Sequence, residues 1–275
     1  MIETIKRTII GRPRLRVYNA TDRVIGLLVT LFLLATVYAL FFRLEYKWDQ
    51  FSFEVASRIA TNFFRFDLVP NDKKLEMFMS LLNTLSLGFV TTILGVVFGL
   101  VFGLLAARNL SSGWLTDVIR GISSFVRAVP TIIWVLIFVA GYGLSATTAV
   151  VGMFFHTFAF FTKAFAESFE EVDGGTIEAL KATGSNWLQI VFGAILPSSM
   201  TKMISWVAIR NEINFGVAVV IGPAAGVPGT IGSAINNAAR GGDYATQGFG
   251  VFMIFLTAWL MEITINNFRQ RSILD

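Results

Sequence analysis

The sequence predicts an all-α membrane protein with six transmembrane helices and both termini in the cytoplasm. Hydrophobic residues make up 55% of the 275 residues and charged residues only 15%, against about 25% charged residues in a typical soluble domain. The apolar residues come in runs of roughly 20, which is the length that a helix needs to cross a bilayer. Lysine and arginine gather in alternate connections between these runs, as is typical of cytoplasmic loops.

Composition also excludes several classes of function. The chain has no cysteine, so disulfides and cysteine metal sites are ruled out. The net charge of +4 reflects the basic loops, and we expect no nucleic-acid partner. We find no GxxxxGK motif followed by Ser or Thr, and no convincing Ser/His/Asp set. The single histidine, His156, is more typical of a hydrogen-bonding membrane residue than of a metal ligand. The sequence therefore predicts no catalytic residue, no metal and no cofactor in this chain.

The N-terminal part predicts one helix between two loops. Residues 1–23 are basic and form a cytoplasmic segment, and 24–42 form the first transmembrane helix. No small-residue cleavage site follows, so we interpret this helix as retained and not as a signal peptide. It and an external loop make up 24–74. Within that loop, four apolar residues at four-residue spacing predict a short amphipathic helix, which packs either on the outer membrane interface or on the protein's own outer surface. They are Phe51, Val55, Ile59 and Phe63.

Five further apolar runs follow. The first, 78–107, holds Gly95, Gly99 and Gly103 on one face, a spacing that favours close helix packing in lipid. Arginines place the next loop in the cytoplasm, and Pro130 begins the following helix. The Gly- and Pro-rich stretch 223–234 is interpreted as an external or re-entrant segment. The four later helices are expected at 130–142, 147–166, 203–222 and 248–265.

A polar, helix-prone segment lies between two of these runs. Gly174-Gly175 is expected to break the preceding helix, and Thr176 is expected to cap a helix that ends near Gly184. Ser185 or Asn186 then begins a second short helix over 187–194, before Pro197 marks the return to the membrane.

This segment resembles the cytoplasmic "EAA" loop of bacterial ABC importer permeases. Five of the seven fixed positions of that pattern are present, while Leu180 and Ala194 depart from it. The matching residues are Glu178, Ala179, Gly184, Leu196 and Pro197. Arg127-Ala-Val-Pro130, the run from His156 to Glu167 and the RxExN of Arg210 to Asn214 are similar to permeases of phosphonate-type importers. The resemblance covers roughly residues 75–270.

The resemblance implies a type I ABC importer permease core over 75–270, with a coupling loop at 176–197 that binds the ATPase. The implied partners are ATP-binding cassette ATPase subunits, a second permease chain that is identical, an extracytoplasmic substrate-binding protein and the lipid bilayer. ATP and Mg²⁺ belong to the ATPase, so the chain itself is a transport subunit and not an enzyme. The implied process is import by alternating access across the bacterial cytoplasmic membrane, with phosphonate, phosphate or a related oxyanion as substrate.

The expected helix at 203–222 carries polar residues at membrane depth, which usually face a cavity or a partner. Arg210 and Asn214 share a face, whereas Glu212 lies about 200° round the helix from Arg210 and cannot simply pair with it. One interpretation is a polar translocation pathway in which arginine favours an anion. The other is hydrogen bonding between helices, and the sequence favours neither. The candidate pathway residues are Arg210, Glu212, Asn214, Arg127 and His156.

Other classes remain open at this point. An importer of a methionine-like substrate would share the coupling loop. A secondary transporter would need internal repeats or midplane carboxylates, and we find no repeat, with Glu212 the one convincing intramembrane acid. A structural membrane protein would have no use for a coupling loop.

Overall fold

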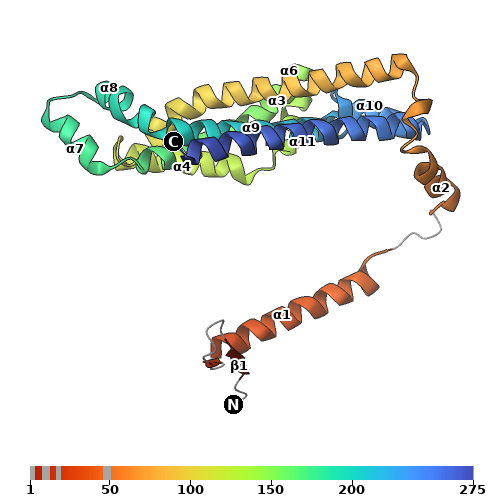
Figure 1. The fold of residues 1–275 in the computed structure, drawn as a ribbon, viewed down its shortest axis with the longest axis horizontal. Coiled ribbons are helices and arrows are strands. Elements are labelled where there is room, and N and C mark those ends of the chain that lie inside the picture. The colour runs from red at the N-terminus through yellow and green to blue at the C-terminus, as the bar shows by residue number, and fades with distance from the viewer. Residues whose placement is uncertain (1–3, 8–12, 17–19, 46–50, 275) are drawn as a thin grey trace. The chain divides into compact units, whose positions relative to one another are not determined.

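The computed structural model describes residues 4–7, 13–16, 20–45 and 51–274, which fall into two compact units, Met1–Glu54 and Val55–Asp275 (Figure 1). In the first unit, strands β1 (Thr4–Arg7) and β2 (Pro13–Arg16) pair antiparallel. The all-α prediction did not include this pair. Parts of the predicted segments 1–23 and 24–74 lie outside the described residues.

The first apolar helix forms where it was predicted. Helix α1 (Ala20–Tyr38) continues through a π-helical turn, η1 (Ala39–Arg43), with a mean hydropathy of 2.6. Its apolar side chains are exposed all round, as suits a helix surrounded by lipid.

The second unit is a bundle of long helices with short helices at its ends. The amphipathic helix predicted around Val55 forms as α2 (Phe53–Asn62), which begins at the boundary between the units. The elements that follow are η3 (Phe66–Leu68), α3 (Asn71–Ala106), α4 (Gly113–Ala128), α5 (Thr131–Tyr142), α6 (Ala146–Glu170), α7 (Gly174–Ala182), α8 (Trp187–Ile190), η4 (Val191–Ile195), α9 (Leu196–Ala225), α10 (Ile231–Arg240) and α11 (Tyr244–Leu274).

Among the described residues, five helices are long and apolar enough to cross a membrane, and six spans result if α4 and α5 count as one. The sequence prediction treated 130–142 as a complete span and the stretch before it as a loop, and this was wrong. Twelve residues of α5 rise only about 18 Å, less than the roughly 30 Å of a bilayer core. A sixth span results only if α5 is taken together with α4, an amphipathic helix that meets it at 85°.

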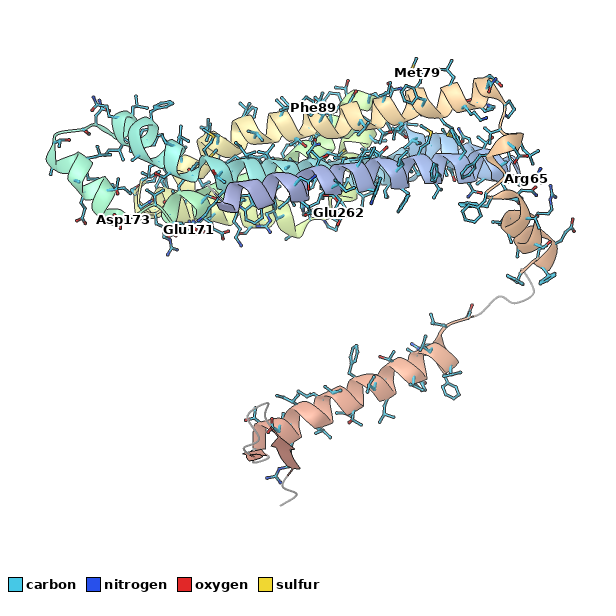
Figure 2. The ribbon with its side chains drawn as sticks, in the orientation of Figure 1. Arg65, Met79, Phe89, Glu171, Asp173 and Glu262 are labelled. Atoms are coloured by element: carbon cyan, nitrogen blue, oxygen red, sulfur yellow. The ribbon has the colours of Figure 1, made fainter. Side chains whose placement is uncertain are left out.

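Close packing of α3 against α6 forms the centre of the bundle. A Cβ atom at Gly95 would lie 2.5 Å from the methyl group of Thr157, and one at Gly103 would lie 3.0 Å from Cβ of Phe165. Gly99, between them, faces Phe161 just as closely. The predicted glycine face is confirmed, because only residues without a side chain allow this approach. Met79 and Phe89, on the outside of α3, are exposed (Figure 2).

Two predicted boundaries around α9 were wrong. The short helix expected at 187–194 does not end before the membrane, because α8, η4 and α9 run on without a break as one apolar stretch from Trp187 to Ala225. Pro197 lies just after the π-helical turn η4, and local π adjustments of this kind let a membrane helix continue through a proline. Gly226, with φ at +68°, ends α9. The irregular chain predicted at 223–234 is therefore shorter than expected, because α9 extends to Ala225 and α10 begins at Ile231.

Candidate functional site

A cluster of polar side chains, the asparagine layer, is buried where α3, α6 and α9 meet. Asn214 on α9 is fully buried. Its Nδ2 donates to Oγ1 of Thr92 on α3 at 2.9 Å, and its Oδ1 accepts from Oγ1 of Thr157 on α6 at 3.0 Å. Both threonines are also fully or almost fully buried. One asparagine therefore joins three spanning helices, and none of its side-chain polar atoms lacks a partner.

One turn earlier on the same face of α9 lies the arginine layer, formed by Arg210, His156 and Phe160. Arg210 is only 4% exposed. Its Nη2 donates to Nδ1 of His156 and to Oγ1 of Thr157, each at 3.0 Å, and its Cζ lies 5.1 Å from the centre of the Phe160 ring. Within the described residues, Nε of Arg210 is buried without a partner and no carboxylate pairs with the guanidinium.

The other two candidate pathway residues lie apart from this layer. Glu212 is half-buried and forms no ion pair with Arg210, as the helical spacing predicted. Arg127 is half-buried and lines a cavity between α4 and α6. The structure therefore brings Arg210, His156 and Asn214 together, and places Glu212 elsewhere.

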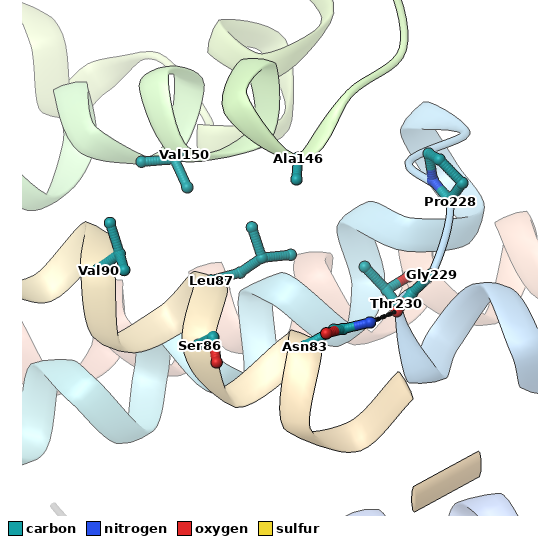
Figure 3. Close-up of a pocket in the computed structure, with 9 residues that line it drawn as sticks. All are labelled: Asn83, Ser86, Leu87, Val90, Ala146, Val150, Pro228, Gly229 and Thr230. Atoms are coloured by element: carbon teal, nitrogen blue, oxygen red, sulfur yellow. Dashed lines mark hydrogen bonds between the residues drawn. The ribbon is translucent and has the colours of Figure 1, made fainter. Parts of the chain in front are cut away.

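A pocket of about 350 Å³ lies against the N-terminal half of α3, beside the glycine-rich turn that follows α9 (Figure 3). Asn83 Nδ2 donates to the carbonyl of Gly229 at 3.1 Å, and Oγ1 of Thr84 accepts from the amide of Ile231 at 2.9 Å. These two bonds anchor the start of α10 to α3. The remaining wall is mostly apolar.

The polar segment between α6 and α9 projects at one end of the second unit, where α7 and α8 are seen (Figure 1). The break after α6 falls at Glu171–Asp173, and Gly174-Gly175 lie in the first turn of α7, so the expected glycine break was wrong. Asp173, not Thr176, caps this helix: its Oδ2 accepts from the amide of Thr176 at 3.0 Å.

The end of α7 has the geometry of a Schellman motif. Gly184 has φ at +83°, the left-handed region that glycine adopts most easily. The amide of Gly184 donates to Lys181 O at 3.0 Å and that of Ser185 to Leu180 O at 3.1 Å. Asn186 then caps α8 through a reciprocal capping box with Gln189, so of the two predicted starts, Ser185 and Asn186, the structure has Asn186.

One face of this segment packs inward and the other is open. Ile177 and Ile190 are buried in the core beneath the segment, and Nε1 of Trp187 donates to the carbonyl of Leu110 at 3.0 Å. Leu188 and Phe192 are 57% and 67% exposed. Of the five residues that match the coupling-loop pattern, Leu196 is half-buried and the rest are exposed: Glu178, Ala179, Gly184 and Pro197. The segment is thus fixed from below and presents a free surface.

A bundle of spanning helices with a buried polar cluster and a rigid segment at one end is the architecture of a membrane transport subunit. The model of the family described as "Binding-protein-dependent transport system inner membrane component" matches residues 99–271, and the chain belongs to this family. It is a multi-pass protein of a bacterial inner membrane, with a type I ABC importer permease fold.

Three comparisons place the chain more closely. It is 27% identical over 202 residues to the phosphate-import permease PhnE of Mycolicibacterium smegmatis, covering 72% of this chain and 37% of that protein. It is 34% identical over 143 residues to the phosphite permease PtxC of Stutzerimonas stutzeri, covering 52% of each. The chain thus spans about half, or less, of these relatives' length. Its fold is similar to a chain of the inward-facing MetNI methionine ABC transporter, with TM-score 0.66 and 19% identity over 74% of this chain and 99% of that one.

Several residues of the site were not predicted from the sequence. Thr92, Thr157 and Phe160 complete the two layers, but single threonines and phenylalanines in apolar runs are common and give no signal by themselves. Arg127 was predicted as a pathway residue, whereas Arg120 was interpreted only as loop charge and Ser123 only as loop sequence. Their spacing of three and four residues is the signal that predicts one face of a helix.

Proposed function

We propose that the chain is the membrane-spanning subunit of an ATP-driven importer and forms the pathway for phosphonate, phosphate or a related oxyanion by alternating access. The observation that carries the proposal is Arg210, a buried cation with an unpaired Nε and no carboxylate partner among the described residues.

The energetics of this arginine favour an anion. A charged side chain at membrane depth is costly unless it is paired or hydrated, and such residues usually face a substrate or ion pathway. His156 and Thr157 offer lone pairs to the guanidinium but no negative charge. A bound oxyanion would supply that charge and accept bidentate hydrogen bonds from the planar fork. Phosphate-class anions fit this need, and two of the relatives are named for phosphate and phosphite.

The α7–α8 segment supports a mechanical link to an ATPase. Its capped helices and αL glycine give it a fixed shape, and its exposed face carries Glu178, Ala179 and Gly184 without a hydrogen-bond or ion-pair partner for Glu178 in the described part of the chain. We propose that ATP-binding cassette subunits, with their ATP and Mg²⁺, close against this face. A second, identical permease chain completes the pathway, and an extracytoplasmic binding protein delivers the anion. Hydrolysis takes place on the ATPase, so this subunit is not an enzyme.

ATPase activity of the chain reconstituted with its ATPase subunit tests the proposal. Binding protein loaded with phosphate, phosphonate or phosphite is expected to stimulate hydrolysis. Glu178→Ala and Gly184→Asp are expected to lower the stimulated rate by about tenfold while leaving assembly intact, because they alter the surface that transmits the motion. Glu171→Ala, an exposed acid outside the coupling segment, is the matched control.

The stimulating ligand identifies the substrate. Stimulation by methionine alone would make the chain a methionine-type permease and remove the oxyanion proposal. Failure to assemble with any ATPase, or coupling variants that match the wild type, would contradict the coupling proposal.

A further inference from the structure

The second cationic site of the molecule is a cavity between α4 and α6, here called the α4–α6 pocket. Its volume is about 150 Å³, well above the roughly 10–15 Å³ that one buried water molecule requires. A small tetrahedral anion therefore fits. The lining residues are Arg120, Ser123, Ser124, Arg127, Thr162 and Lys163.

The lining follows from the sequence of α4. Arg120, Ser123, Ser124 and Arg127 are spaced at three, four and seven residues, so they lie on one face of this helix. The opposite wall comes from Thr162 and Lys163 on α6. Every lining side chain is polar, and three of the six are cations.

Charge in the pocket is only partly neutralised. Arg120 pairs with Glu170 at 2.5 Å and Lys163 with Glu167 at 3.6 Å. Neither carboxylate lines the cavity. Arg127 forms no hydrogen bond or ion pair with any residue that the structure describes. Three cations against two carboxylates leave one positive charge, and it belongs to Arg127.

A buried hydroxyl gives an independent indication of a ligand. Ser123 is 3% exposed and lines the pocket, yet its Oγ has no hydrogen-bond partner among the described residues. A buried polar group without a partner is rare in native structures and calls for an explanation such as a bound ion. A tetrahedral oxyanion would accept from Ser123 and from the guanidinium of Arg127 together.

The pocket lies on the coupling side of the arginine layer. Lys163 follows His156 by seven residues on α6, a rise of roughly 10 Å toward the end of the helix that leads to α7. The arginine layer and the pocket therefore lie about two turns apart along α6, with the pocket nearer the coupling segment.

We propose that the α4–α6 pocket binds a phosphate group on the cytoplasmic side of the protein, with Ser123 and Arg127 as its principal ligands. The phosphate belongs either to a soluble anion that has crossed the membrane or to the headgroup of an anionic lipid. The inference deepens the proposed function, and it rests on that function only for the soluble anion's route to the pocket.

The test measures binding to the full chain, purified and delipidated in a maltoside detergent, which contains no phosphate. The probes are radiolabelled inorganic phosphate and phosphatidylglycerol. Saturable phosphate binding is expected, and Arg127→Gln should weaken it about tenfold, as expected for loss of a charged hydrogen bond. Ser123→Ala should weaken it about threefold, as expected for a neutral one. Arg108→Gln, an exposed arginine outside the pocket, should bind as the wild type does.

The two sources of phosphate give different results. If phosphatidylglycerol displaces the labelled phosphate, and does so less well in Arg127→Gln, the natural ligand is a lipid headgroup. If it does not, the ligand is a soluble anion. Absence of saturable binding of both probes, or equal binding by wild type, Arg127→Gln and Ser123→Ala, would overturn the proposal.

Failure of this inference is distinguishable from failure of the proposed function. Arg210→Gln is expected to lower uptake about 100-fold yet keep the Arg127-dependent binding. A protein that imports phosphate without such binding refutes only the pocket. A protein that binds phosphate in this way but imports none refutes only the oxyanion importer.

Discussion

The asparagine layer and the arginine layer lie one turn apart on the same face of α9, yet their hydrogen bonding differs. Asn214 has a partner for each of its side-chain polar atoms and joins three helices. Arg210 has a buried donor, Nε, without a hydrogen-bond partner, and no carboxylate among the described residues balances its charge. The sequence left two interpretations open, hydrogen bonding between helices and a translocation pathway. The first therefore describes Asn214, and the second describes Arg210.

The difference shows how polar residues in a membrane helix can be sorted. A side chain whose hydrogen bonds are complete within the protein stabilises the bundle and has nothing left to offer a ligand. A buried cation whose hydrogen bonds and charge are incomplete destabilises the empty state, which is acceptable where a substrate completes it. The variants below test this contrast and the packing and capping that support it.

The largest effect is expected from Gly99→Leu, which separates the helices that hold both layers. A side chain here would collide with Phe161 on α6, and overpacking of this kind costs about 1–3 kcal/mol or more. We expect a large loss of folded protein, measured as the monodisperse fraction in detergent. Gly26→Leu, at a glycine with open space around it, should fold normally. A normal yield for Gly99→Leu would show that α3 and α6 do not pack as described.

Asn214→Ala should lower the free energy of unfolding more than Arg210→Gln does, and this difference distinguishes the two layers. Two interhelix hydrogen bonds are lost, and bonds of this type contribute about 0.6–1.7 kcal/mol each in membrane proteins. Chemical unfolding in mixed micelles should therefore show a loss of about 1–2 kcal/mol. Arg210→Gln should lose less than this, because it removes an unbalanced charge. A larger loss for Arg210→Gln would mean that the arginine is structural too.

Asp173→Ala tests whether the coupling segment is held rigid by its cap. Loss of a side-chain N-cap costs a helix about 1 kcal/mol. We expect faster hydrogen exchange across the first turn of α7, measured by mass spectrometry, with α8 unchanged because Asn186 and Gln189 cap it independently. Equal exchange in variant and wild type would show that packing of Ile177 alone holds α7.

The smallest effect is expected at Arg65, an exposed arginine that forms an ion pair with a carboxylate. Its Nη2 donates to Asp67 at 2.9 Å, and this bond holds the pKa of Asp67 below its usual range. Any stability from the pair is present above the unfolded pKa of about 3.9 and is lost as pH falls through the folded value. Because exposed ion pairs contribute little, Arg65→Gln should leave the thermal midpoint at pH 7 nearly unchanged. A marked drop would contradict the contrast with Arg210.

Much of the architecture was predictable because hydrophobic run length and glycine spacing act locally. The α3 glycine face and the end of α7 at Gly184 both follow from residue type and position, and the start of α8 was narrowed to Ser185 or Asn186. The α4 helix was not predictable in this way. Its apolar and basic residues alternate at helical spacing, and they form no apolar run that suggests a span. The continuous passage from α8 into α9 was not predicted because Pro197 normally signals a break, whereas here the π-helical turn before it lets the helix continue.

The candidate site was predictable only in part. Arg210 and Asn214 are conspicuous because they are polar residues in an apolar run, and their shared face follows from the helical period. Their partners Thr92 and Thr157 come from helices far away in sequence, so only the packing of α3 and α6 against α9 could identify them. Those partners decide whether every hydrogen-bonding atom and every charge of a polar residue is satisfied within the protein.

Uptake of labelled phosphate into proteoliposomes, by the chain assembled with its ATPase and binding protein, tests the role of Arg210 most directly. Arg210→Gln should lower the rate about 100-fold, because leaving a buried anion without its cation costs roughly 2–5 kcal/mol. Arg210→Lys should retain part of the activity, and Asn214→Ala, compared at equal folded protein, should retain most of it. Uptake by Arg210→Gln at the wild-type rate would contradict the assignment of this arginine to the anion pathway.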